Sequence, residues 1–191
     1  RAESEEAAEA LCRPVVEEIC RRYGDVVYGV DVDNLESVVV RLLSEKGLHL
    51  ATAESCTGGM IASMLVGVSG ASEVFEEGYV TYSNEVKIKN LGVSAETIRK
   101  YTVVSGPVAE EMAKGAADRS GAALALSTTG YAGPDDGEDG TPAGTVYIGV
   151  YCCGAVKSAH CHFKGDRNEV RRQAAREALR LALEALEERN G

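Results

Sequence analysis

Three residues of this chain have the side-chain types and the spacing of a hydrolytic site. Ser55 lies in the segment Ala53–Gly59, and Tyr82 and Lys87 follow it at the two ends of the segment 82–87. A serine hydroxyl becomes a nucleophile when a nearby base takes its proton, and a lysine is that base only when burial or a neighbouring cation lowers its pKa from about 10.4. Tyr82 would then pass protons between the two. The alternative is an exposed helical lysine and a tyrosine packed at the rim of a strand.

The segment Ala53–Gly59 lies where a predicted strand meets a predicted helix. Backbone N–H groups at the start of a helix lack partners within the helix, and with the helix dipole they favour an anion or a developing oxyanion. The segment has no phosphate-loop lysine, no dinucleotide glycine fingerprint and no Gly-x-Ser-x-Gly elbow. We therefore expect either an oxyanion-binding turn or a capped helix whose glycines only make a tight turn.

Two further segments carry groups that suit such a site. Ser72 lies in a predicted turn, where it competes with Ser55 for the nucleophile role or caps a helix. Gly130–Pro134 follows a predicted buried strand, at the edge where open α/β sheets bind ligands. The acidic residues of 135–139 lack the alternate spacing of a calcium loop, so we interpret this stretch as a solvated loop.

Two arginines, Arg167 and Arg171, lie at the start of the last predicted helix. Cations at this position oppose the helix dipole, so they need acidic neighbours or an anionic ligand. A phosphate is a suitable ligand for arginine.

The six cysteines show no Cys-x-x-Cys pair and no regular spacing, which favours free buried thiols over a disulfide framework. Cys161 lies between His160 and His162 in a predicted strand. Successive residues of a strand point to opposite faces, so these three are poorly placed to bind one zinc ion. We expect no metal and no cofactor.

The composition is that of a globular protein, with 45% hydrophobic residues. A total of 30 acidic against 20 basic residues gives a net charge of −10, which disfavours contact with a phosphate backbone, so no nucleic-acid partner is expected. No stretch reaches the roughly 18 apolar residues that span a bilayer, and the acidic start is unlike a secretory leader. We expect a soluble, cytoplasmic protein without a membrane partner. The first residue is Arg rather than Met, which leaves an upstream domain open.

Predicted strands and helices alternate along most of the chain. Hydrophobic periodicity predicts strands at 48–53, 77–82, 122–127, 145–152 and 158–163, the last two as a hairpin. It predicts helices at 35–43, 60–66, 87–90, 94–101, 107–119 and from Asn168 onward. This order predicts an α/β fold, a three-layer α/β/α sandwich with a mixed, mostly parallel sheet of about five strands.

The last helix carries an alanine-rich stripe that packs either on the sheet or on a second copy of the chain, so the sequence leaves open whether the protein is a homodimer.

The residues before this pattern form a separate segment. Apolar residues at helical spacing in 5–23 are interrupted by Pro14, which predicts two short helical pieces rather than one long helix. We therefore divide the chain into an N-terminal helical annex or linker, residues 1–34, and a main domain, residues 35–191.

The chain resembles the CinA C-terminal domain family, which includes nicotinamide-nucleotide amidase. The resemblance covers about residues 35–187, and residues 8–34 are similar to the connecting segment of longer two-domain CinA proteins, which implies an upstream CinA N-terminal domain as a partner. Five segments carry it, in the order and spacing of the family: Ala53–Gly59, Tyr82–Lys87, Gly130–Pro134, Pro142–Val146, and Gly165–Arg167 with Val170 and Arg171.

The resemblance implies hydrolysis of the carboxamide of nicotinamide mononucleotide to nicotinate mononucleotide and ammonia, on a three-layer α/β/α fold without a metal. In this reaction Ser55 is the nucleophile, Lys87 is the base, and Tyr82 is a proton relay or an orienting group. The backbone of Cys56–Gly59 would supply oxyanion donors.

Other residues are expected to hold the nucleotide substrate. Ser72 would position it, if Ser72 is not itself the nucleophile, and Arg167 would meet the phosphate or the ribose. The residues expected to bind substrate are Thr57, Gly58, Gly59, Ser72, Gly130, Arg167 and Arg171. Tyr131 stands where the family has a smaller aliphatic residue, which implies a different pocket wall and a shifted substrate preference. The acidic loop after Pro134 would repel a phosphate if it folded over the cleft.

A different interpretation is a non-catalytic domain of a competence- or damage-inducible CinA protein that binds a nucleotide or a protein partner. A binding domain has no need of a lysine beside a hydroxyl, so the joint presence of Ser55, Tyr82 and Lys87 favours the enzyme. The family's historical name also suggests a role in DNA uptake, which the net charge of −10 disfavours.

Overall fold

The N-terminal segment is built around one helix, α1 (Glu5–Tyr23). The structure, a computed structural model, describes residues 2–24, 27–32 and 34–188, and its contacts divide the chain into two units, Arg1–Asn34 and Leu35–Gly191. The prediction of two helical pieces was wrong, because α1 continues through Pro14. A proline removes one N–H bond of the helix, and here the Ser4 cap and charges that match the helix dipole at both ends support the rest.

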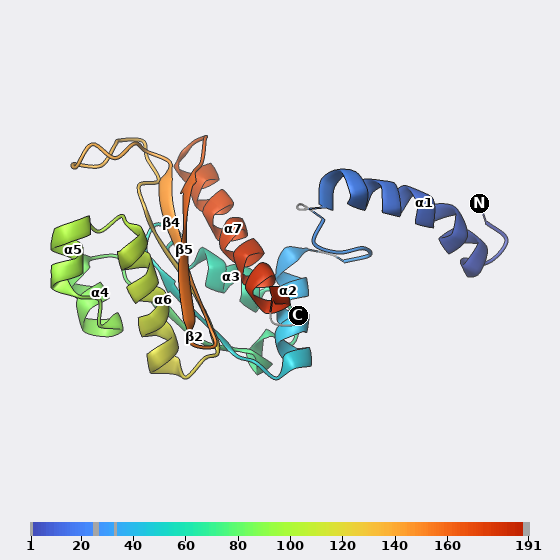
Figure 1. Cartoon of the computed structure of the whole chain (residues 1–191), viewed down its shortest axis with the longest axis horizontal. Helices are drawn as coiled ribbons and strands as arrows, with labels where there is room; N and C mark the ends of the chain where they lie inside the picture. The colour runs from blue at the N-terminus through green and yellow to red at the C-terminus, as the bar shows by residue number, and fades with distance from the viewer. Residues whose placement is uncertain (1, 25–26, 33, 189–191) are drawn as a thin grey trace. The chain divides into compact units, whose positions relative to one another are not determined.

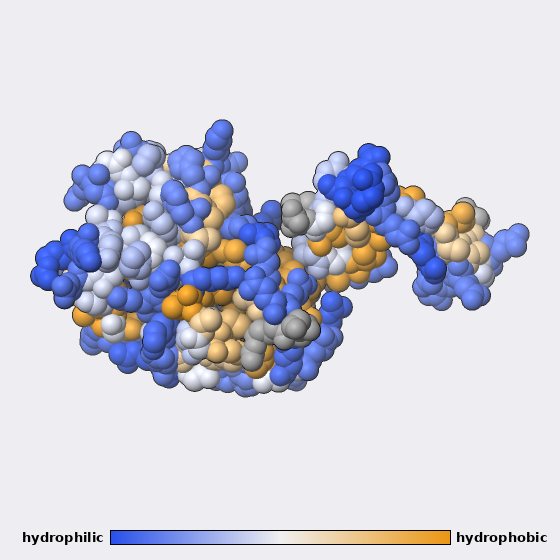
Figure 2. Space-filling model, viewed as in Figure 1, coloured by the Kyte–Doolittle hydropathy of each residue, from blue (hydrophilic) through white to orange (hydrophobic). Residues whose placement is uncertain are grey.

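Helix α1 exposes an apolar face. None of its residues is buried within the first unit, and the exposed large side chains recur every four residues, at Leu11, Val15, Ile19 and Tyr23. Figure 2 shows apolar side chains gathered on this unit. The spacing puts them on one side of the helix.

The second unit contains a five-stranded sheet in the order β2-β1-β3-β4-β5. Strands β2, β1 and β3 pair in parallel, and β4 is antiparallel to both β3 and β5. Four strands therefore run in one direction and β4 opposes them, which confirms the predicted mixed sheet and the terminal hairpin. The strands are β1 (Leu50–Glu54), β2 (Phe75–Val80), β3 (Leu124–Gly130), β4 (Thr145–Cys152) and β5 (Ala155–His162).

Helices cover both faces of the sheet (Figure 1), as predicted for a three-layer sandwich. One layer holds α2 (Leu35–Lys46), α3 (Met60–Val66) and α7 (Arg167–Glu187), and the other holds α4 (Asn84–Leu91), α5 (Ala95–Tyr101) and α6 (Gly106–Ser120). The alanine-rich stripe of α7 is buried within this unit, because α7 packs on β3 and β4. It is therefore not available to a twin subunit.

The two central strands are buried on both faces. Every residue of β1 is buried, and so is β3 up to its last residue. Strand β2 lies two residues earlier than predicted and β3 extends three residues further. These shifts follow the pairing, since Phe75 of β2 aligns with Leu50 and Gly130 of β3 aligns with Val146. The carboxyl ends of β1, β2 and β3 therefore meet at one edge, where Ser55, Tyr82 and Tyr131 follow them.

A close contact between two helices sets the position of α4. Gly115 of α6 lies against the backbone of Leu91 at the end of α4, and a β-carbon on Gly115 would overlap the carbonyl oxygen of Leu91. Because α4 carries Lys87, this glycine fixes the lysine relative to the sheet.

We expect Gly115→Ala to lower the free energy of unfolding by about 1–2 kcal/mol in urea denaturation. The overlap with backbone forces the two helices apart at a cost of about 3 kcal/mol, and a gain of about 1 kcal/mol in helix propensity offsets only part of it. Gly24→Ala is the matched control, since Gly24 has a helical φ of −41° and no atom within 4 Å of an added β-carbon. Equal stability of Gly115→Ala and the parent would contradict the role of this contact.

Candidate active site

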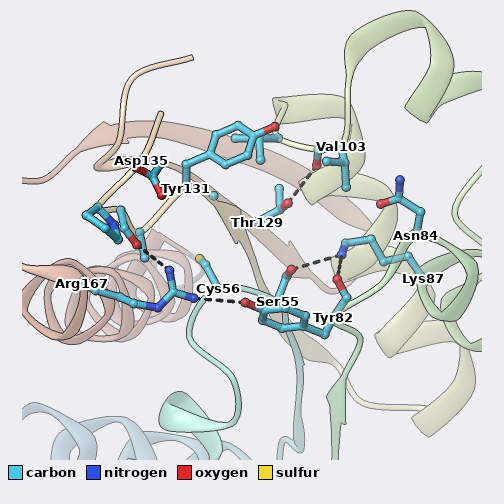
Figure 3. A pocket seen from close by; sticks show the side chains of 15 residues that line it. Ser55, Cys56, Tyr82, Asn84, Lys87, Val103, Thr129, Tyr131, Asp135 and Arg167 are labelled. Atoms are coloured by element: carbon cyan, nitrogen blue, oxygen red, sulfur yellow. Dashed lines mark hydrogen bonds between the residues drawn. The ribbon is translucent and has the colours of Figure 1, made fainter. Parts of the chain in front are cut away.

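A cavity of about 370 Å³ lies at the carboxyl edge of the parallel strands (Figure 3). Its walls come from the loop after β1, the start of α4, the segment between α5 and α6, the end of β3 with the loop that follows, and the start of α7. Polar, charged and aromatic side chains among its lining residues include Ser55, Tyr82, Lys87, Tyr131, Asp135 and Arg167.

The serine and the lysine are in direct contact. Lys87 Nζ lies 3.1 Å from Ser55 Oγ, 2.9 Å from the carbonyl oxygen of Thr81 and 3.2 Å from that of Tyr82. A neutral amine has two N–H donors and one lone pair. The two carbonyls take the two N–H groups, and the lone pair is left for the hydroxyl of Ser55. This arrangement allows the lysine to accept the proton of the serine.

Burial stabilises the neutral form of the Lys87 amine, so that this form is populated near neutral pH. The Lys87 side chain is 1% exposed, and this burial lowers its pKa from 10.5 to about 8, against a smaller opposing effect of Cys56. Lys87 lies on the same face of α4 as the buried Leu91, one turn further along. Helix α4 begins just after β2, with Ser83 as its cap, so the inward face delivers the amine to the edge of the sheet.

The other nucleophile in the cavity is held inactive by its surroundings. Cys56 follows Ser55 directly and lines the same cavity. Burial raises the pKa of its thiol to about 11, so it stays protonated at neutral pH. Ser55 is the better candidate nucleophile because its hydroxyl contacts the buried amine of Lys87 at 3.1 Å.

A buried carboxylate folds the loop that carries Ser55. Glu54, fully buried at the end of β1, accepts hydrogen bonds from the N–H groups of Gly59, Ile61 and Ala62 at 2.9, 3.1 and 2.9 Å. The start of α3 is thus occupied by the protein's own anion. The N–H of Gly58 donates to the carbonyl of Ser55 at 3.1 Å. Of the expected oxyanion donors of Cys56–Gly59, the N–H groups of Gly58 and Gly59 therefore already have partners within the protein.

Arg171 also binds the loop that carries Ser55. Its Nε donates to the carbonyl of Cys56 at 3.1 Å and its Nη2 to that of Thr57 at 2.8 Å, while the Thr57 hydroxyl lies 2.7 Å from that of Thr128. The C=O and N–H of a trans peptide point in opposite directions, so holding the Cys56 carbonyl turns the N–H of Thr57 away from α7. Thr57, Gly58, Gly59 and Arg171, which the sequence predicted as substrate contacts, are not among the residues that line the cavity.

Tyr82 and Arg167 meet at the mouth of the cavity. The Tyr82 side chain is 63% exposed, and its hydroxyl accepts a hydrogen bond from Arg167 Nη2 at 3.1 Å. Arg167 Nη1 donates to the carbonyl of Gly133 at 2.6 Å. The phenol does not lie between Ser55 and Lys87, which touch directly, so the relay interpretation finds no support. Tyr82 contacts the lysine only through its backbone carbonyl. Neighbouring side chains of an extended chain point to opposite sides, so the Tyr82 ring is exposed while the side chain of Thr81 is buried.

Ser72 lies far from this arrangement along the strands. It is exposed in the short 3-10 helix η2 (Ala71–Glu73) that precedes β2, whereas Ser55 follows β1, and parallel strands place these two ends at opposite edges of the sheet. Ser72 does not line the cavity, whereas Gly130 does.

Asn84 and Thr129 also line the cavity and were not predicted from the sequence. The position of Asn84 between the helix cap and Lys87 was the signal that could have found it.

The described residues contain no group of three or more His, Cys, Asp or Glu side chains that could hold a metal ion. In the same part of the chain, no helix is both long and apolar enough to cross a bilayer.

The sheet and the buried lysine beside a serine define an α/β domain with a candidate serine–lysine site. A family model described as the CinA C-terminal domain matches residues 32–186, and the chain belongs to this family. Among solved structures, a CinA superfamily protein from Klebsiella pneumoniae is 40% identical with a TM-score of 0.79, covering 81% of this chain and 96% of that one. One from Escherichia coli is 40% identical with a TM-score of 0.78, covering 88% of this chain and 98% of that one.

Longer relatives match nearly the whole chain. A CinA-like protein of Kosmotoga olearia is 45% identical over 97% of this chain and 45% of its own length. A putative competence-damage inducible protein of Clostridium beijerinckii is 52% identical over 91% of this chain and 42% of its own length. The chain thus spans less than half the length of these relatives.

The contact between Ser55 and Lys87 predicts a nucleophile whose reactivity depends on pH. A small sulfonyl fluoride is expected to modify Ser55, with a rate that rises with pH and levels off above about 8, because only neutral Lys87 accepts the proton. Intact-protein mass and peptide mapping give the rate and the modified residue. Lys87→Met should slow the reaction about a hundredfold, whereas Lys89→Met, at an exposed position of the same helix, should not. Labelling at Ser72 or a pH-independent rate would count against the pair.

Proposed function

We propose that this domain hydrolyses the carboxamide of nicotinamide mononucleotide to nicotinate mononucleotide and ammonia. The observation that carries the proposal is the contact of 3.1 Å between Ser55 Oγ and a lysine amine whose burial lowers its pKa to about 8. Membership in the CinA C-terminal domain family supports the substrate class, since the sequence resemblance implies this reaction. A serine activated by a neutral amine is suited to attack an amide carbonyl.

In the proposed reaction the first step forms an acyl-enzyme. Ser55 Oγ attacks the carboxamide carbon while Lys87 Nζ takes its proton, and the carbonyls of Thr81 and Tyr82 hold the ammonium that results. The N–H groups of Cys56 and Thr57 stabilise the oxyanion. The ammonium then protonates the amide nitrogen as the C–N bond breaks, and ammonia leaves.

The second step restores the enzyme. Neutral Lys87 takes a proton from a water molecule, whose oxygen attacks the ester carbon. The C–O bond to Ser55 breaks, its oxygen takes back the proton, and nicotinate mononucleotide leaves. One amine thus serves as base and acid in both steps, which is why its pKa near neutrality matters.

Arg167 is the proposed contact for the phosphate of the substrate. Its guanidinium lies at the mouth of the cavity and is oriented by the carbonyl of Gly133 and the hydroxyl of Tyr82. Arginine has five N–H donors, so two such bonds leave others for an anion. Tyr82 is therefore proposed to orient Arg167 rather than to relay protons.

Ammonia release from nicotinamide mononucleotide tests the proposal. We expect turnover by the parent protein and a loss of about a hundredfold or more in Ser55→Ala and Lys87→Met, because each removes one half of the pair. Lys87→Arg should not restore activity, since a guanidinium stays protonated. Ser72→Ala is the control and should retain activity, because Ser72 does not line the cavity.

Full turnover by Lys87→Met would contradict the proposed base. Binding of the nucleotide by the parent without ammonia release would favour the non-catalytic interpretation. No observation on the described residues favours that second function, since a buried lysine without a catalytic task only costs stability.

A further inference from the structure

Tyr131 forms one wall of the cavity and is fixed in place on both sides. Its N–H donates to the carbonyl of Thr145 at 2.9 Å, and its carbonyl accepts from the N–H of Gly144 at 2.6 Å. Gly137 of the following loop packs on the ring so closely that a β-carbon there would overlap Cε2 and Cζ. The half-buried ring is thus held between the loop and the cavity that it lines with Ser55 and Lys87 (Figure 3).

The surroundings of this ring are acidic. Asp135 lines the cavity, and Glu138 and Asp139 follow in the same loop. Burial first, and then the charges of Asp139 and Glu138, raise the pKa of the Tyr131 phenol. None of the ion pairs among the described residues includes these three carboxylates. Acidic side chains therefore lie at the cavity wall, as Asp135, and in the loop beside Tyr131, as Glu138 and Asp139, without an ion pair among the described residues.

The two basic side chains of the cavity lie on other elements. Lys87 is on α4 and is largely neutral above about pH 8, and Arg167 is at the start of α7, bound to Gly133 and Tyr82. The cavity thus combines an anion-binding arginine with an aromatic ring among carboxylates. An aromatic face attracts a cation, and adjacent carboxylates strengthen that attraction.

We propose that Tyr131, together with Asp135, recognises a positively charged ring, so that the site selects pyridinium amides over amides of neutral rings with the same shape. This inference rests on the proposed function, whose substrate carries its carboxamide on a pyridinium ring and a phosphate that suits Arg167.

Two ligands that differ only in ring charge test the proposal. Nicotinamide mononucleotide has a cationic ring, and its reduced dihydro form has a neutral one with the same carboxamide, ribose and phosphate. Dissociation constants are measured by calorimetry in the Ser55→Ala background, so that neither ligand is turned over. We expect tighter binding of the cationic form, and a loss of about 3- to 30-fold for that ligand alone in Tyr131→Leu.

Three further variants separate recognition from packing. Tyr131→Phe keeps the aromatic face and should keep the preference, whereas Asp135→Asn removes a carboxylate and should reduce it. Tyr101→Leu, at a part-exposed tyrosine outside the cavity, should change neither constant. Equal binding of the two ligands by the parent, or an equal loss for both in Tyr131→Leu, would overturn the proposal. Because binding is measured without turnover, absence of ammonia release would contradict the proposed function and leave this preference standing.

Discussion

The candidate site depends on one constraint, the near-complete removal of a primary amine from water. Lys87 contacts two backbone carbonyls and the Ser55 hydroxyl, and none of the ion pairs among the described residues includes it. A buried amine without a carboxylate partner favours its neutral form, which is the form that can act as a base. Helix α4 carries this lysine, and Gly115 of α6 packs against the backbone of Leu91 at the end of α4, so the packing of these two helices helps to position the buried amine.

The sequence predicted the layers of the fold and the central pair of the site. Alternating strand and helix patterns predicted the mixed sheet and its hairpin. Strands buried on both faces are recognisable as apolar runs, and amphipathic helices as apolar residues at helical spacing. The pairing of Ser55 with Lys87 was predictable because both follow parallel strands, whose carboxyl ends share an edge. The continuity of α1 through Pro14 was not, since capping and dipole-matched charges opposed the local effect of the proline.

The residues that hold the Ser55 loop in place could not be predicted from the sequence, because their contacts depend on how the chain folds. Arg171 was expected to bind substrate, but the fold brings α7 beside α3, and its guanidinium takes carbonyls of the Ser55 loop instead. Glu54 was not singled out at all, although its carboxylate takes three N–H groups of that loop and of α3. Together these two side chains bind N–H groups at one end of the loop and carbonyls in its middle, beside the Ser55 hydroxyl that contacts the lysine. The orientation of the Tyr82 side chain likewise could not be predicted, because its hydroxyl bonds Arg167, which lies 85 residues later in the chain.

The protonation of Lys87 itself is the most direct test. NMR of protein with isotope-labelled lysine, with the Lys87 signal assigned by its absence in Lys87→Met, follows the Cε and Nζ shifts as pH is raised. We expect this one lysine to titrate near pH 8, well below the exposed lysines. A Lys87 signal that stays cationic until about pH 10, with the exposed lysines, would contradict the serine–lysine site.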